Sequence, residues 1–542
     1  MSSLQKKKIV VLGLDGATWK LLDPLMKRGY MPTLASLVKK GTRATLKSTY
    51  PAMTAPSWTT CVTGKNPGHH GVFDFMLPTD SLSRMKFATG KDIVDKTLYE
   101  MLHEHGYTPI LINLPGSYPP RLKDAITITS LLTQGDEWIF PATLKDEFEG
   151  FKKYRLTPDE SLRLKERKEY YIEDLLKHLD EQMACVQWLF NNKPWDFFFY
   201  LFSHTDWISH LAYTELIEDF DESSLRIFKK IDEYFAWFMQ HIPTDAHLII
   251  LSDHGFASYK KVFYFNKWLE QQGYLVTNDA GDQMKGAATR RAKEAAKIQS
   301  KQKKLRVGKA AFDLLARFPL LERGVKWVYH AVVKKYLPIH VSVSVGIDFS
   351  KTKVCFPKGS YITNAYINKA WVYSDGIVSH EEYPQLIQEL IVKINSIRDT
   401  EGKSIVKHVY TREEVYGENV PDKAPDLFFE LADYWFVGQF HSGQLFGHEI
   451  HNKHDADGIF LCVGSEFQQN TKIDHLDMQD ITPLILHLSG LDVPKSCDGH
   501  VPFEVFAEGA ESARRLVRFS QETKSTEKDR IQSVIQSLKM KK

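Results

Sequence analysis

The stretch KKIVVLGLDG (residues 7–16) is a run of β-branched and leucine residues that ends in Asp15 and Gly16. A run this apolar is typical of a buried parallel strand, and the Asp-Gly pair that follows it predicts a turn. Two later stretches, WDFFFYLFSHTD (195–206) and HLIILSDHG (247–255), have the same form, an apolar run followed by polar residues. Strands of this kind need helices on both faces of their sheet.

Between these runs, apolar residues recur at spacings of three and four, which predicts helices over 33–40, 96–105, 161–191, 216–238 and 381–397. Alternating strands and helices predict an α/β fold with a doubly wound, mostly parallel central sheet. In such sheets functional groups gather at the carboxyl ends of the strands. Asp15, Asp206, Asp253 and His254 would all lie there.

The length of 542 residues allows one large α/β domain with insertions. We expect a catalytic core over 1–265 and 437–510, an inserted cap that forms the substrate region over 266–436, and a charged, mobile tail over 511–542. The cap includes a basic helical arm over 280–340, with ten Lys or Arg between Lys285 and Lys309 against one acidic residue, Glu294. A solvated helical face is the first interpretation of this arm, and peripheral contact with an anionic surface through 285–309 is the second.

The overall charge is nearly balanced, with 70 Lys plus Arg against 68 Asp plus Glu, so it indicates no polyanionic partner such as nucleic acid. Five widely spaced cysteines without a CxxC pair argue against a disulfide framework or a cysteine-rich zinc site, and favour a cytoplasmic protein. No run of about twenty apolar residues is present, so no transmembrane segment is expected.

Several polar residues near the expected strand ends could bind a metal. Asp206 and His210 in DWISH are four residues apart, which on a helix places both side chains on one face. In SDHG, Asp253 and His254 directly follow a strand, where a bend can turn both toward one cleft. Each pair alone is better explained as ordinary polar structure, as is Asp15 as a turn residue.

The segment HNKHDADGIF contributes histidines from a distant part of the chain, of which His454 is a plausible ligand and His451 another. Three aspartates and three histidines together would supply enough ligands for two divalent ions without any cysteine. That set suits zinc, with manganese or another divalent ion as alternatives. Surface positions are expected for the remaining histidines near these motifs, namely His69, His70, His204 and His448.

The order and wording of these motifs resemble the alkaline phosphatase superfamily, in particular its type I phosphodiesterase and nucleotide pyrophosphatase branch. The resemblance spans nearly the whole chain. It is carried by LDGATW (from Leu14), YPAMTAPSWTTCVTGKNPGHHGVFDF (from Tyr50), DWISH (from Asp206), LSDHGF (from Leu251), HDADGIF (from His454) and DITPLILHLSGLDVPKSCDG (from Asp480).

The resemblance implies a two-metal hydrolase that cleaves phosphodiester or pyrophosphate bonds of a small molecule or nucleotide. In that family the first residue of the TxP segment is the nucleophile, at a helix N-terminus, and the matching residue here is Thr54. The resemblance also implies two sets of metal ligands: Asp15, Thr54, Asp253 and His254 for one ion, and Asp206, His210 and His454 for the other.

The chain departs from the family at two positions. Nucleotide pyrophosphatases carry Asn directly after the Pro of the TxP segment and again at the end of the loop, where this chain has Ser57 and Phe75. Ser57 could still donate a hydrogen bond to a phosphate oxygen, whereas Phe75 has no polar atom to offer. Two alternatives stay open: a phosphomutase or phosphotransferase of the same superfamily, and a catalytically silent binding module.

Overall fold

The computed structural model describes residues 6–163, 167–278, 346–356, 364–438, 444–448 and 450–520. The chain divides into two compact units: unit 1 comprises residues 1–72, 89–257 and 452–542, and unit 2 comprises residues 73–88 and 258–451. The basic arm expected over 280–340, with its segment 285–309, lies outside the described residues, as does 521–542 of the expected tail.

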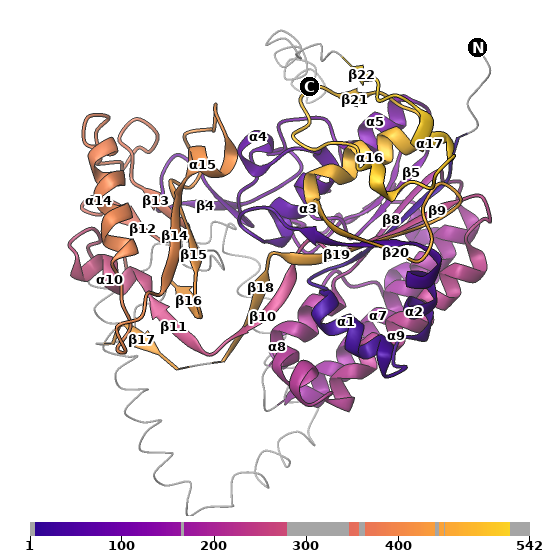
Figure 1. Cartoon of the computed structure of the whole chain (residues 1–542), viewed down its shortest axis with the longest axis horizontal. Helices are drawn as coiled ribbons and strands as arrows, with labels where there is room; N and C mark the ends of the chain where they lie inside the picture. Colours follow the sequence, from indigo (N-terminus) through magenta and orange to yellow (C-terminus); the bar gives the residue numbers. More distant parts are fainter. Residues whose placement is uncertain are drawn as a thin grey trace, which may run out of the picture. The chain divides into compact units, whose positions relative to one another are not determined.

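Unit 1 is built on a nine-stranded sheet (Figure 1) with the order β20-β2-β19-β9-β1-β8-β5-β6-β7. All neighbouring strands are parallel except at β19, which is antiparallel to β2 and β9, and at β7, which is antiparallel to β6. The strands are β1 (Ile9–Leu14), β2 (Thr42–Lys47), β5 (Pro109–Ile112), β6 (Ile126–Ile128), β7 (Ile139–Phe140), β8 (Phe197–Phe202), β9 (His247–Leu251), β19 (Asp457–Val463) and β20 (Thr471–Asp477).

Alternate residues of β1 enter two separate apolar cores, one on each face of the sheet. Val10, Leu12 and Leu14 join one core, whereas Ile9 and Val11 join the other. The first core is covered by α1 (Trp19–Lys27), α2 (Pro32–Lys40), α7 (Lys168–Asn192), α8 (His204–Glu218) and α9 (Glu222–His241). The second is covered by α3 (Thr54–Thr63), α5 (Leu98–Glu104) and α16 (Ile481–Leu488). The doubly wound, mostly parallel sheet predicted from the sequence is confirmed.

One helix prediction is wrong. The apolar spacing over 216–238 predicts a continuous helix, but α8 ends at Glu218 and α9 begins at Glu222. Phe220 has a positive φ of 52°, a backbone conformation that no helix continues through. The Asp221 side chain then caps α9 by accepting a hydrogen bond from the Ser224 N–H at 2.9 Å.

Short elements complete unit 1. They are α4 (Pro67–His70), α6 (Leu144–Glu147), β18 (His451–Asp455), β21 (Val493–Pro494), α17 (Glu511–Arg514) and β22 (Phe519–Ser520). Because β22 pairs with β21, residues 511–520 of the expected tail belong to the fold. The β10 strand (Gly255–Tyr259) begins directly after the bend that follows β9.

Unit 2 contains a four-stranded sheet with the order β12-β13-β15-β14 and a three-stranded sheet with the order β16-β11-β17. Residues 73–88 and 437–451, which we had expected in the catalytic core, cluster with this unit. The elements are β3 (Met76–Pro78), β4 (Met85–Phe87), β11 (Lys261–Tyr264), α10 (Phe265–Gln271), β12 (Val354–Cys355), β13 (Asn364–Ile367), α14 (Tyr383–Asn395), β14 (Val406–Thr411), α15 (Arg412–Tyr416), β15 (Leu427–Leu431), β16 (Tyr434–Val437) and β17 (Phe446–Gly447).

In the described part of the chain, no helix has both the length and the apolar character that a membrane span requires. All five cysteines carry free thiols.

Candidate two-metal centre

Asp15 lies directly after β1, where the chain turns. Gly16 has a φ of +68°, and a Cβ atom on it would approach the Phe256 ring to 2.6 Å, so this turn requires glycine. The Gly16 N–H donates to Oδ1 of Asp253 at 3.2 Å, and the Thr205 hydroxyl donates to the backbone oxygen of Asp15 at 2.6 Å. The ends of β1, β8 and β9 are thereby joined at one edge of the sheet.

Asp253 and His254 follow β9, and both are fully buried. The Ser252 hydroxyl accepts from the Ala17 N–H at 2.8 Å and donates to the backbone oxygen of His254 at 2.6 Å, which holds the bend against the turn after β1. Nδ1 of His254 lies 3.0 Å from the backbone oxygen of Gly255. A carbonyl oxygen only accepts hydrogen bonds, so Nδ1 carries the proton and Nε2 presents its lone pair.

That lone pair faces carboxylates. Nε2 of His254 lies 3.6 Å from Oδ1 of Asp15 and 3.4 Å from Oδ2 of Asp253. Burial lowers the pKa of His254 to about 3, so the imidazole is neutral and forms no ion pair with either aspartate. An electron pair directed at two carboxylate oxygens is repulsive unless a cation or a proton lies between them.

A second group of the same kind forms around the start of α8. Asp206 and His210 lie one turn apart, with Nε2 of His210 3.4 Å from Oδ1 of Asp206, and β18 brings Nε2 of His454 to 3.4 Å from the same oxygen. The Nε2 atoms of His210 and His454 are 3.1 Å apart. Nδ1 of His210 lies 3.2 Å from the backbone oxygen of Asn452, and Nδ1 of His454 lies 3.2 Å from that of Ala52.

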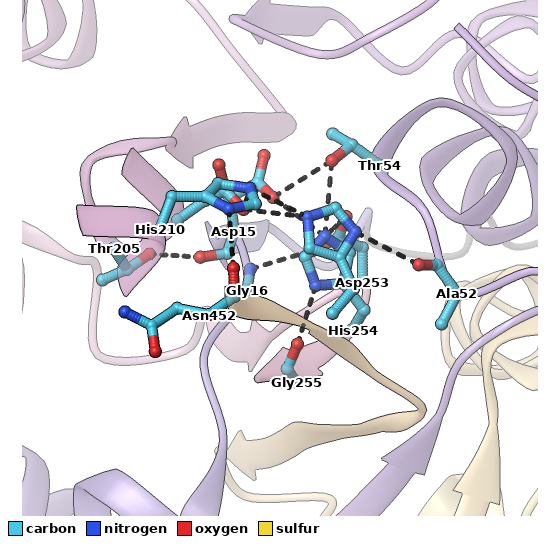
Figure 2. Close-up of polar contacts among 12 residues, drawn as sticks. Asp15, Gly16, Ala52, Thr54, Thr205, His210, Asp253, His254, Gly255 and Asn452 are labelled. Carbon is cyan, nitrogen blue, oxygen red and sulfur yellow. Dashed lines mark hydrogen bonds and ion pairs between the residues drawn. The ribbon is translucent and has the colours of Figure 1, made fainter. Parts of the chain in front are cut away.

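The Nε2 lone pairs of both imidazoles of this second group therefore meet at one point, next to Oδ1 of Asp206; Figure 2 shows His210 in this position. Burial lowers the pKa of His210 and of His454 to about 3, so neither ring carries a second proton that could bridge the two nitrogens. Backbone carbonyls that fix Nδ1 while Nε2 stays available are the usual arrangement of metal-binding histidines.

Thr54 is the first residue of α3 and is buried. Its hydroxyl oxygen lies 3.5 Å from Oδ1 of Asp15 and 3.4 Å from Nε2 of His254 (Figure 2). Met53 precedes the helix in extended conformation, and its side chain does not cap the first turn. The N–H groups of that turn, beginning with Ala55, are the ones that a helix leaves without intrahelical acceptors, so they are suited to an anion at this end.

The electrostatics of the three carboxylates also favour cations. Burial raises the pKa of Asp15 well above its usual range, and the neighbouring Asp253 and Asp206 carboxylates raise it further. Burial likewise raises the pKa of Asp253 to about 8, although the Gly16 N–H acts in the opposite direction. Among the described residues, Oδ1 of Asp206 and Oδ2 of Asp253 are buried without a hydrogen-bond partner.

The described residues contain two sets of ligand atoms, and within each set all atoms lie within 4.8 Å of one another. Asp206, His210 and His454 form one set, and Asp15, Asp206 and His254 form the other. Asp206 belongs to both sets, and Asp253 adjoins the second through His254. The residues present therefore fit two divalent cations. The structure brings together all seven residues that the sequence analysis assigned to metal binding.

Ser57 lies one turn further along α3 than Thr54 and is fully buried. Its hydroxyl oxygen is 2.8 Å from those of Ser48 and Thr49, so these two side chains hold it. Phe75 belongs to unit 2.

Two histidines expected at the surface are buried instead. His70 lies with its Nε2 atom 2.9 Å from the Thr60 hydroxyl, and His204 lies with its Nε2 atom 2.9 Å from Nδ1 of His178. No motif in the sequence marks the orienting groups Thr205 and Ser252 or the backbone oxygens of Ala52 and Asn452. No residue pattern marks a backbone oxygen, so only the folded chain reveals these contacts.

Comparison with known proteins identifies the family of the chain. The model of the type I phosphodiesterase / nucleotide pyrophosphatase family matches residues 9–337, more than half of the chain. The solved structure of phosphonoacetate hydrolase from Sinorhizobium meliloti 1021 has the same fold: it is 13% identical with a TM-score of 0.51, over 88% of this chain and 94% of that one.

Ectonucleotide pyrophosphatase/phosphodiesterase 5 is more distant in structure. The human protein is 13% identical, with a TM-score of 0.49, over 90% of this chain and 96% of that one. An inactive variant of the murine protein, solved in complex with AMP, is 14% identical, with a TM-score of 0.46, over the same shares of the two chains. No curated protein matches this sequence. The chain belongs to the type I phosphodiesterase/nucleotide pyrophosphatase family of the alkaline phosphatase superfamily.

Proposed function

We propose that this protein is a two-metal hydrolase that cleaves phosphodiester or pyrophosphate bonds of a small molecule or nucleotide, with Thr54 as its nucleophile. One observation carries the proposal: the Thr54 hydroxyl lies within 3.5 Å of both Asp15 and His254, inside a buried set of carboxylates and neutral imidazoles. A buried hydroxyl next to ligand atoms for a cation is suited to activation as an alkoxide.

Asp15, Thr54, Asp253 and His254 would hold one ion, and Asp206, His210 and His454 the other. Asp206 also lies among the ligand atoms of Asp15 and His254, so its carboxylate would support both ions. Imidazole and carboxylate ligands suit zinc, and manganese is the alternative. When bound, the two ions supply charge that stabilises the Thr54 alkoxide and the phosphate oxygens.

The reaction would proceed in two displacements at phosphorus. In the first, Oγ1 of Thr54 loses its proton and attacks, and the bond from phosphorus to the leaving oxygen breaks. In the second, water attacks the phosphorylated Thr54, the Oγ1–P bond breaks, and the Thr54 hydroxyl regains a proton. The N–H of Ala55, at the start of α3, would hold a phosphate oxygen in both steps.

The charges around Thr54 favour diesters over monoesters. The hydrogen-bond partners of Thr54 itself are the Asp15 carboxylate and the His254 imidazole, whereas the cationic side chains of Lys453 and Arg163 act on the second group, at His210. A monoester dianion carries one more negative charge than a diester. Because neither partner of the Thr54 hydroxyl is cationic, that additional charge is compensated less well beside the nucleophile.

We therefore expect purified protein with zinc or manganese to cleave bis(p-nitrophenyl) phosphate with a kcat/KM at least about tenfold above that for p-nitrophenyl phosphate, a difference of about 1.4 kcal/mol. Dinucleotides and nucleoside triphosphates test the pyrophosphate branch in the same assay. A strong preference for the monoester would refute the diesterase assignment.

Product analysis with added alcohols separates hydrolysis from transfer. Release of the free acid in the presence of glycerol supports a hydrolase. Predominant formation of the glyceryl ester would instead identify a phosphotransferase. No turnover and no bound metal with any of these ions would favour a binding module.

A further inference from the structure

Helix α8, which carries two of the candidate metal ligands, has a kink within it. Asp206 and His210 lie in the part before the kink, and Ala212 has the non-helical dihedrals φ −140° and ψ 20°. Thr214 lies in the part after it. Regular dihedrals fix the relative positions of helical residues, so at Ala212 the helix itself does not fix how its two parts are placed. Other contacts must do this.

One residue of β18, Asn452, contacts both parts of α8. Its backbone oxygen lies 3.2 Å from Nδ1 of His210, before the kink. Its side-chain Oδ1 accepts a hydrogen bond from the Thr214 hydroxyl at 2.7 Å, after the kink. Asn452 is buried, and Figure 2 shows it beside His210. The two oxygens of this residue therefore join the two parts of the helix.

The geometry of β18 extends this connection to His454. Side chains alternate along a strand, so Asn452 and His454, which are two residues apart, lie on the same face of β18. Burial agrees, because these two residues are buried and the other three residues of the strand are only partly buried. The hydrogen bond between Thr214 and Asn452 therefore fixes the position along α8 at which His454 faces the helix.

We infer that Asn452 and Thr214 are positioning residues that hold His210 and His454 in place for one cation, an inference that rests on the two-metal centre of the proposed function. The Nε2 atoms of the two neutral imidazoles are 3.1 Å apart, and their lone pairs repel one another when no cation is bound. Contacts that hold ligands together against such repulsion strengthen metal binding. Asn452 does this twice, because its backbone oxygen orients the His210 ring and its side chain is tied to Thr214.

Calorimetric titration of the metal-free, full-length protein with zinc tests the inference, because it measures both ions and requires no turnover. Thr214→Val removes the hydroxyl and keeps the shape of the side chain, whereas Asn452→Ala removes the acceptor and keeps the backbone oxygen. We expect each variant to bind one ion about tenfold more weakly and the other with parent affinity, since outer-shell partners contribute 10- to 100-fold. Thr214→Ser keeps the donor and should retain the parent affinity for both ions.

Combined variants distinguish positioning from a general loss of stability. The double variant of Thr214→Val and Asn452→Ala should bind the weakened ion about as well as either single variant, because both changes remove the same hydrogen bond. In a His210→Ala background the positioned ligand is already missing, so Thr214→Val should not weaken the remaining ion. Thr214→Val remains informative where Asn452→Ala does not fold.

The matched control is Thr42→Val at the start of β2. The Thr42 hydroxyl also joins distant segments, because it donates to the backbone oxygen of Gln468 at 2.9 Å. β2 runs in the same direction as β1 and β9, so its first residue lies at the edge of the sheet opposite to the metal ligands that follow those strands. This variant should bind both ions as the parent does.

The outcomes separate this inference from the proposed function. If the parent binds fewer than two ions, the two-metal centre is wrong and the inference fails with it. If the parent binds two ions and both single variants bind them with parent affinity, the positioning role is refuted while the two-metal centre stands. Equal weakening of both ions, additive effects in the double variant, or the same weakening in Thr42→Val would also overturn the inference, because each indicates a general loss of stability.

Discussion

Thr54→Ala is expected to lower kcat toward bis(p-nitrophenyl) phosphate at least about a thousandfold, because loss of a nucleophile removes the covalent route while the surrounding charges remain. Thr54→Ser keeps a hydroxyl at the start of α3 and should retain measurable turnover. Steady-state kinetics of the three proteins, with the bound metal measured in each, provides the test.

The matched control is Thr63→Ala in the same helix. The Thr63 hydroxyl donates to the backbone oxygen of Thr59 at 2.8 Å, so this variant also loses one buried hydroxyl of α3 but at the end away from Thr54. We expect its kcat to stay within a few fold of the parent value. Equal activity of Thr54→Ala and the parent would show that the nucleophile is another group.

The number of bound metal ions in ligand variants should depend on whether the replaced residue belongs to one ligand set or, like Asp206, to both. His210 belongs to one set of ligand atoms and Asp206 to both. We therefore expect two bound ions in the parent and one in His210→Ala. In Asp206→Ala both ions should bind at least about a hundredfold more weakly, because even outer-shell partners of a metal contribute 10- to 100-fold to its affinity. Elemental analysis after equilibration with zinc measures the stoichiometry, and calorimetry measures the affinities.

His241→Ala serves as the control, because this histidine lies on α9 with Nδ1 2.8 Å from the backbone oxygen of Trp237 and belongs to neither set. Its metal content should equal that of the parent. If His210→Ala kept two ions, or if Asp206→Ala lost none, the assignment of the two sets would be incorrect.

The sequence allows the central sheet to be predicted because buried parallel strands are continuous apolar runs. β1, β8 and β9 fall within the three stretches that were recognised, and the acidic residues after them lie at the carboxyl ends of the strands. The break between α8 and α9 was missed because Phe220 satisfies the helical spacing while its backbone leaves the helix. The spacing of apolar residues indicates which side chains lie on one face of a helix, but it does not indicate the φ angle of a single residue.

The site could be predicted as a set of residues, yet only the folded chain shows how they are oriented. DWISH and SDHG mark aspartates and histidines, but the hydrogen bonds from Nδ1 that direct Nε2 inward go to backbone oxygens contributed by distant segments. The extent of unit 2 likewise depends on pairings between distant segments. β11, at residues 261–264, pairs with β16 and β17 more than 160 residues later, and no local signal reports a pairing over that distance.

The central claim is that Oγ1 of Thr54 receives the phosphoryl group. Acid quenching during turnover tests this claim most directly. Parent protein and a diester substrate are mixed with the preferred metal, quenched in acid within one turnover, digested, and sequenced by mass spectrometry. We predict a phosphoryl or phosphoester adduct on Thr54, absent from the control without substrate. An adduct on any other residue, or rapid product release with no adduct on Thr54 at any quench time, would contradict the mechanism.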